Sequence, residues 1–226
     1  MKAENNKRKG QNKVDFSSKK DKTFVYPIRD WKEYLGESLL IIFSVLLALG
    51  MTEYINKIHE RENTKSLLKN IVIELKNNKK AIQEMNEYNL HVLGKIDSAL
   101  VSRDLQKKLV SNDEFHLKQI APLGVLYRYQ ENDAWTVAKN NDIMSKINIE
   151  SISILSRVYE EQDRISKVEE EVARVLFNRS SRDPRQVHKT LILIRDIYHA
   201  WAVDRVPGLL STIDAAIVKI DSLSSK

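Results

Sequence analysis

The sequence predicts an all-α protein with a single N-terminal transmembrane helix that continues into an antiparallel helical bundle. One run, Leu39 to Met51, is long and free of charged residues. Apolar residues recur with a helical period through most of the chain that follows. The 226 residues include only six glycines and four prolines to interrupt helices. We therefore expect residues 1–30 to be a disordered basic cytoplasmic tail, 31–56 the transmembrane helix, and 57–226 an extracytoplasmic helical bundle domain.

The tail carries most of the chain's charge. Between Met1 and Glu33 there are ten basic and five acidic residues, so this segment holds +5 of the total +6. It is too polar to bury a core, which predicts disorder. Basic residues before a first span favour the cytoplasmic side and attract anionic lipid, so the bilayer is its expected partner. The remaining chain is nearly neutral, which argues against a nucleic-acid partner.

The apolar run has the flanks of a membrane span. Tyr34 and Tyr54 bracket it, and twenty residues at the helical rise place them about 30 Å apart, the thickness of a hydrocarbon core. This predicts a single-pass protein of the cell inner (cytoplasmic) membrane, with the N-terminus in the cytoplasm. The alternative is a cleaved leader, for which Ala48 and Gly50 offer small residues, although the stretch before the apolar core is long for one.

One face of the predicted span is small and polar. Glu37, Ser44, Ala48 and Thr52 follow one another at steps of seven, four and four residues. Small residues four apart allow two membrane helices to approach closely, which predicts a helix–helix contact and a homo-oligomer. Glu37 is a candidate proton or ion site within that contact. The plainer interpretation is that its side chain reaches the near headgroup region.

The anchor resembles that of a family of uncharacterised bacterial membrane proteins. Their pattern is Gly-Glu, an apolar stretch closing on Ala-Leu, and an Asn-bearing junction before a charged helix; a second similar block runs from Ala134 to Gln162. The resemblance implies a short cytoplasmic tail, one span and a helical extracytoplasmic domain, and it implies no activity. This chain departs from the commoner Asn-Trp-Asn junction, with Tyr-Ile-Asn instead. The matching anchor positions are Gly36, Glu37, Ala48, Leu49, Asn56 and Glu60.

After the span, an apolar stripe predicts a long stem helix with two asparagines on its seam. A short helix is expected from Asp104 to Val110, and Ser111 or Asn112 is a candidate cap for another. The stripe consists of Leu67, Ile71, Leu75, Ile82, Met85, Val92, Ile96 and Leu100, and the asparagines are Asn78 and Asn89.

Three further helices are expected before a short final one. Asn132 or Asp133 caps a short one that ends near Asn140, and Asn148 caps a longer one that reaches Phe177. The last runs from about Pro184 to Arg205, and we expect the next proline and glycine, at 207 and 208, to end or kink it before a short final helix.

The sequence between Pro122 and Asp133 is the one place where a small-molecule pocket could be built. The run from Gly124 to Gln130 reads as a short strand or an aromatic loop. On the last helix, the spacing places an arginine on the apolar side, where it can bind an acidic ligand, stack on an aromatic ring or cap carbonyls. The alternative is that the aromatic residues fill the end of the core. The candidate pocket residues are Arg128, Trp135, Trp201 and Arg205.

No motif points to catalysis. There is no cysteine and no i,i+4 histidine pair, and neither a glycine-rich phosphate loop nor a Gly-x-Ser-x-Gly elbow occurs. We therefore expect no catalytic residue, cofactor or metal site. The sequence favours a non-enzymatic, membrane-anchored scaffold or interaction protein that associates with itself through span and stalk. The alternatives are a ligand-sensing domain that acts through a membrane protein partner, and an accessory subunit of an ion or proton channel.

Overall fold

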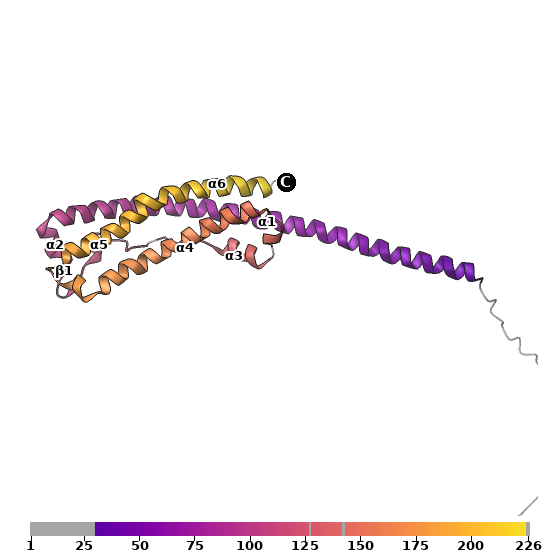
Figure 1. Ribbon diagram of the computed structural model, residues 1–226, viewed down its shortest axis with the longest axis horizontal. Helices are drawn as coiled ribbons and strands as arrows, with labels where there is room; N and C mark the ends of the chain where they lie inside the picture. Colours follow the sequence, from indigo (N-terminus) through magenta and orange to yellow (C-terminus); the bar gives the residue numbers. More distant parts are fainter. Residues whose placement is uncertain (1–29, 127, 142, 225–226) are drawn as a thin grey trace, which may run out of the picture. The chain divides into compact units, whose positions relative to one another are not determined.

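The computed structural model describes residues 30–126, 128–141 and 143–224, and these are mostly helical (Figure 1). The chain forms two compact units, Met1–Glu53 and Tyr54–Lys226. We call the second the helical unit. The predicted disordered tail, residues 1–30, lies outside the described residues except for Asp30. The helices are α1 (Trp31–Val101), α2 (Arg103–Leu109), α3 (Asp133–Asn140), α4 (Ile149–Phe177), α5 (Val187–His199) and α6 (Val206–Ser224), and the strands are β1 (Val110–Ser111) and β2 (Glu114–Phe115).

The first unit consists, over its described residues, of the N-terminal part of α1. Its large apolar side chains are exposed, for example Leu40 at 68 % and Phe43 at 63 %. Among the described residues, α1 is the one helix that is long and apolar enough to cross a membrane, and none of its most apolar 18-residue stretch is buried. An exposed apolar stretch of this size suits a lipid environment far better than water.

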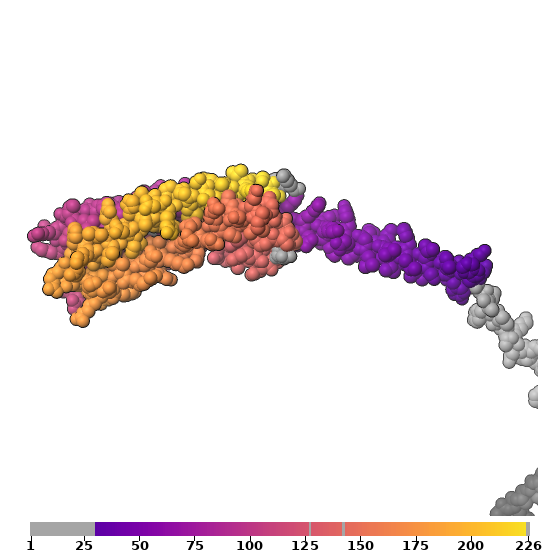
Figure 2. All heavy atoms as spheres, viewed as in Figure 1, coloured from indigo at the N-terminus to yellow at the C-terminus, as the bar shows by residue number. Residues whose placement is uncertain are grey.

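The helical unit is built around one apolar core that joins α1 to α4, α5 and α6. On α1 the fully buried residues recur at helical spacing, among them Ile71, Leu75, Ile82 and Ile96, as the sequence predicts. Both seam asparagines, Asn78 and Asn89, are buried. Figure 2 shows α4 and α6 side by side on one face of this unit.

A β-hairpin follows α2, and it replaces the helix start predicted at Ser111 or Asn112. Val110 pairs with Phe115, and Ser111 with Glu114, in two antiparallel strands. Asn112 and Asp113 form the turn between them, with φ of 52° and 59°. A two-residue hairpin turn of type I′ has positive φ at both central positions, and asparagine and aspartate adopt it at low cost. The predicted helix cap is therefore wrong, because these residues serve a turn.

The next two helices begin where the sequence predicts. Asn132 precedes α3, which ends at Asn140. The side-chain oxygen of Asn148 accepts a hydrogen bond of 2.9 Å from the backbone N–H of Ser151, which satisfies one of the free donors at the start of α4. The described residues between Pro122 and Asn132, which exclude Tyr127, form no helix or strand, and this selects the loop from the two predicted alternatives.

The last helix differs from its prediction at both ends. It begins at Val187 and not at Pro184, because a short 3₁₀ turn occupies Arg179–Arg182 and Asp183 caps a further turn through Arg185 N–H. Pro207 does not end it: a π-helical turn over Ala200–Arg205 leads directly into α6. Because proline has no N–H and its ring clashes with the carbonyl four residues back, the wider π turn accommodates it.

The π turn changes which residue faces the core. Within it, the backbone N–H of Val206 donates to the carbonyl of Trp201, five residues earlier. A regular helix would place Arg205 below Trp201, as the sequence suggested. The extra residue moves Arg205 to the surface and puts Val206, 1 % exposed, into the core. The predicted position of Arg205 on the apolar side is therefore wrong.

Tyr198 on α5 provides a test of the core. It is 2 % exposed, and its hydroxyl has no hydrogen-bond partner in the structure of the described residues. Tyr198→Phe removes this unsatisfied group, so we expect the free energy of unfolding to rise by about 1 kcal/mol. Denaturant unfolding of the full chain in detergent measures the change. A clear loss of stability would show that the hydroxyl does have a partner.

The same variant has an expected pH signature. Burial, helped by nearby Tyr88, raises the pKa of Tyr198 above its ordinary value of 10.0. As the pH rises, the phenol therefore loses its proton in the unfolded chain before it does so in the folded chain. The contribution of this difference to the free energy of unfolding is complete below about pH 10 and is lost as the pH rises further. The stability advantage of Tyr198→Phe should grow above that pH.

Candidate functional site

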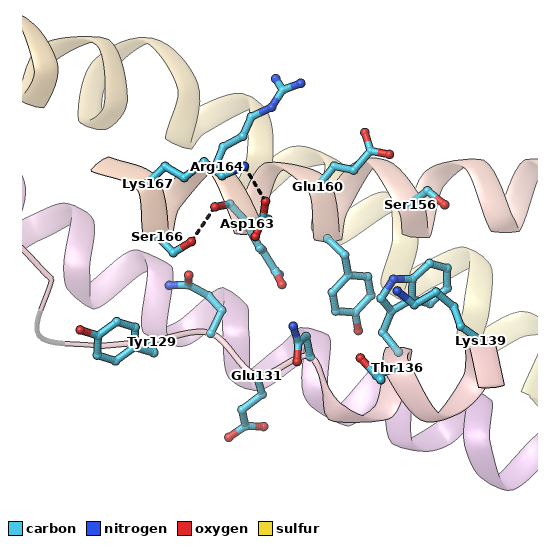
Figure 3. A pocket seen from close by; sticks show the side chains of 15 residues that line it. Tyr129, Glu131, Thr136, Lys139, Ser156, Glu160, Asp163, Arg164, Ser166 and Lys167 are labelled. Atoms are coloured by element: carbon cyan, nitrogen blue, oxygen red, sulfur yellow. Dashed lines mark hydrogen bonds and ion pairs between the residues drawn. The ribbon is translucent and has the colours of Figure 1, made fainter. Parts of the chain in front are cut away.

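The candidate site is a pocket of about 740 Å³ in the helical unit, between α3, α4 and the loop before α3. In Figure 3, Thr136 and Lys139 of α3 lie on one side and Ser156 and Glu160 of α4 on the other. Tyr129 closes the end formed by the loop. Contacts to α1 hold the loop in this position.

A buried carboxylate on α1 anchors the start of α3. Glu74 is 5 % exposed and accepts hydrogen bonds from three donors. These are the phenol of Tyr159 at 2.6 Å and the backbone N–H groups of Ala134 at 2.7 Å and Trp135 at 3.4 Å. A carboxylate at the first turn of a helix satisfies donors that the helix itself leaves free. Burial, and next the bond to Glu74, raise the pKa of Tyr159, so its phenol keeps its proton.

Asn78, one turn further along α1, holds the loop. Its Oδ1 accepts from the backbone N–H of Glu131 at 2.8 Å, and its Nδ2 donates to the Glu131 carbonyl at 2.7 Å. The same Nδ2 donates to Oε1 of Gln162 on α4 at 3.2 Å. The backbone N–H and carbonyl of Glu131 are thus both satisfied by the buried side chain of Asn78, which fixes the loop against α1.

Gln162 presents an unpaired donor in this pocket. Its side chain is 5 % exposed and lines the cavity, and its Nε2 has no partner in the structure of the described residues. The amide orientation is determined by the network: the Glu131 N–H fixes Oδ1 of Asn78, so Nδ2 of Asn78 faces Oε1 of Gln162. Nε2 of Gln130, another lining residue, is also buried and unpaired.

The aromatic and charged groups of the pocket are largely occupied with one another. Trp135 and Tyr159 are stacked with parallel rings, their centroids 5.1 Å apart, and Lys139 Nζ lies 5.6 Å from the Trp135 ring centroid. On α4, Lys167 pairs with Asp163 at 2.9 Å. Three acidic and three basic side chains line the pocket, so its net charge is near zero, and its buried unpaired donors are the neutral amides of Gln130 and Gln162. This arrangement suits a small neutral ligand with acceptor oxygens.

The structure does not bring the four candidate pocket residues together. Trp135 lines the pocket described above, whereas Trp201 and Arg205 line a separate pocket of about 690 Å³ between α4 and α5. Arg128 lines neither and pairs with Glu84 at 2.9 Å. Within the described residues no group of three or more His, Cys, Asp or Glu side chains is arranged to hold a metal ion.

The small polar face of the predicted span lies on the exposed part of α1. The Ser44 hydroxyl donates to the Leu40 carbonyl at 2.8 Å, and the Thr52 hydroxyl to the Ala48 carbonyl at 2.9 Å. Both hydroxyls are therefore satisfied by their own helix. This lowers the cost of placing them in lipid, where no water is present to accept their hydrogen bonds. Glu37 is exposed on the same helix.

Glu74, Tyr159 and Gln162 were not predicted as parts of a site. A signal for Glu74 was present, because it lies at helical spacing from Ile71 and Asn78 and therefore on the buried side of the stem. A charged residue at such a position needs buried donors. Gln162 carried no comparable signal, because a glutamine on an acidic helix is ordinary surface composition.

Comparison of the chain with family models, with curated proteins and with solved structures found no match.

Proposed function

We propose that the protein is a non-enzymatic scaffold or interaction protein anchored in the inner membrane. Residues 31–56 span the bilayer once, the N-terminus lies in the cytoplasm, and residues 57–226 lie outside. The observation that carries this proposal is the exposed apolar stretch of α1, which the described residues leave uncovered. The resemblance of Gly36, Glu37 and the Ala48-Leu49 pair to the single-span family supports the same arrangement.

The anchoring and the orientation are tested by two measurements. Alkali-washed membranes should retain the full chain, because a helix inserted in lipid resists such washing. Protease added to intact spheroplasts should digest the helical unit. A protein that washes off contradicts the anchor, and a retained protein whose helical unit is protected contradicts the orientation.

The helical unit is proposed to be a bundle whose C-terminal helices run antiparallel to α1. Lys79 pairs with Asp214 at 2.5 Å, and Asp97 with Arg195 at 2.6 Å, so positions rise along α1 as they fall along α5 and α6. The contacts between α1 and α4 join Glu74 to Tyr159 and Asn78 to Gln162, and there the numbering rises on both helices. The proposed bundle thus contains one parallel pair.

Self-association is assigned to the face of the span that carries Ser44, Ala48 and Thr52. Ala48→Ile adds bulk where two helices would approach, so we expect cross-linking of the full chain in membranes to fall by roughly fivefold or more. Gly50→Ile is the matched control, since it adds bulk on the opposite side of the helix, where an added Cβ meets nothing within 4 Å. Unchanged cross-linking in Ala48→Ile would contradict this seam.

Ligand sensing is the second candidate function, and it is favoured by the unpaired Nε2 of Gln162 in the pocket beside Trp135. A buried donor without a partner costs folding free energy that a ligand oxygen would recover. A thermal-shift screen of small neutral amides and polyols tests this candidate. Stabilisation that disappears in Gln162→Leu supports it, and a screen without any stabilising compound counts against it.

A further inference from the structure

A second pocket, also of about 740 Å³, lies at the start of the helical unit. One wall is the stretch of α1 from Tyr54 to Leu68. The other wall comes from residues 146–148, just before α4, and from Leu223 near the end of α6. The pocket therefore forms only when the segment before α4 and the end of α6 both lie against α1.

Basic side chains dominate the charge of this pocket. Lys57, Arg61 and Lys65 follow one another at steps of four residues on α1, and Lys146 faces them from the other wall. The one lining carboxylate, Glu60, already pairs with Lys146 at 2.7 Å. Arg61 and Lys65 have no carboxylate partner in the part of the chain that the structure describes. Arg61 and Lys65 thus contribute positive charge to the pocket that no ion pair among the described residues offsets.

The remaining lining is apolar. Ile58 and Leu68 contribute from α1, Leu68 being 2 % exposed, and Ile147 and Leu223 contribute from the opposite wall. A free phosphate ion would pair with the basic side chains and leave this apolar surface exposed to water. A molecule that combines an anionic group with a hydrocarbon part would cover both.

The position of the pocket along the chain indicates which molecule with an anionic group and a hydrocarbon part lies near it. Lys57 directly follows the proposed span, residues 31–56, and Arg61 is four residues further on, within about 14 Å of Lys57 in any conformation of the chain. A basic cluster that close to a membrane span lies at the depth of the phospholipid headgroups. This step rests on the proposed membrane anchoring of residues 31–56.

We propose that this pocket binds the headgroup of an anionic phospholipid, with its phosphate at Arg61 and Lys65 and the adjoining part of an acyl chain on Ile58 and Ile147. A bound lipid would join α1 to the residues before α4 and to the end of α6. The site would thereby make the fold of the helical unit next to the membrane depend on lipid composition.

The test uses the full chain purified from alkali-washed membranes in mild detergent. Native mass spectrometry then counts the phosphatidylglycerol and phosphatidylcholine molecules retained from an equimolar mixture. Arg61→Gln/Lys65→Gln removes both proposed phosphate ligands. Lys69→Gln/Lys76→Gln is the matched control: it changes the same charge on the same helix, at exposed residues that do not line the pocket.

We expect the wild-type chain to retain phosphatidylglycerol in preference to phosphatidylcholine. Loss of two phosphate contacts should weaken that retention by about tenfold, with the control unchanged. Equal retention of the two lipids, or equal loss in variant and control, would overturn the site. Displacement of the lipid by millimolar inorganic phosphate would overturn the choice of a lipid as occupant. A chain that is absent from the washed membranes fails at the first step, and that result refutes the anchoring and not the pocket chemistry.

Discussion

Replacement of Glu74 by alanine is expected to lower the free energy of unfolding by about 3–5 kcal/mol. The carboxylate is 5 % exposed and is the acceptor for the Tyr159 phenol and for two backbone N–H groups at the start of α3. Removing it leaves all three donors buried without this partner, and it opens a space beneath the stacked rings of Trp135 and Tyr159. Glu74→Gln should fall between the wild type and alanine, because its carbonyl oxygen still accepts from one side.

Denaturant unfolding of the full chain in detergent, followed by near-ultraviolet circular dichroism, measures this effect. The signal of the stacked Trp135 and Tyr159 rings should weaken in the folded variant as well, because α3 loses its attachment. Glu87→Ala on the same helix is the matched control, since that carboxylate is exposed. A loss for Glu74→Ala no larger than that of the control would mean that the network does not hold α3 in place.

Val206→Asp is expected to destabilise the helical unit by about 4 kcal/mol or more, because it places a carboxylate in the core without a partner. Val206 is 1 % exposed, whereas its neighbour Arg205 is exposed. Arg205→Asp introduces the same side chain one position earlier and should change stability by no more than about 1 kcal/mol.

The pair of variants tests the π turn itself. A regular α-helix through residues 200–205 would place position 205 toward the core and position 206 at the edge of the buried face. Aspartate would then destabilise the unit more at position 205 than at position 206. Thermal unfolding of both variants, side by side, decides between the two helical registers. Similar losses of stability in the two variants would contradict the burial of Val206 beside an exposed Arg205.

The helices were predictable wherever one physical signal dominated. The stem stripe from Leu67 to Leu100 and the cap at Asn148 were identified because apolar periodicity and capping act within a few residues of the chain. The exposed apolar stretch of α1 was predictable for the same reason.

Two features of the fold were not predictable, because each depends on a balance between local alternatives. Asn112 and Asp113 suit both a helix cap and a hairpin turn, and the pairing of Val110 with Phe115 decides in favour of the turn. Pro207 suits both a helix end and a π turn. The burial of Val206 and Leu209 against the rest of the core accompanies the continuous helix.

The candidate sites depend still more on tertiary structure. Trp135 and Trp201 are similar in sequence context, yet they line different pockets. The unpaired donor of Gln162 exists only because Asn78, 84 residues earlier, occupies the other side of its amide. No pattern within a single helix indicates a contact between residues so far apart in the sequence.

The ion pairs between helices have a consequence for how the unit responds to salt. Lys79 with Asp214, Asp97 with Arg195 and Glu150 with Lys219 each join two helices, and all six side chains are at least partly exposed. Exposed pairs add little to stability, and salt screens them, so the melting temperature should hardly change between low and high ionic strength. These ion pairs instead determine which alignment the packed helices adopt. A helix shifted along its neighbour, or turned end for end, would separate the opposite charges and bring like charges together. The apolar core supplies the free energy of folding, and the surface charges select the alignment.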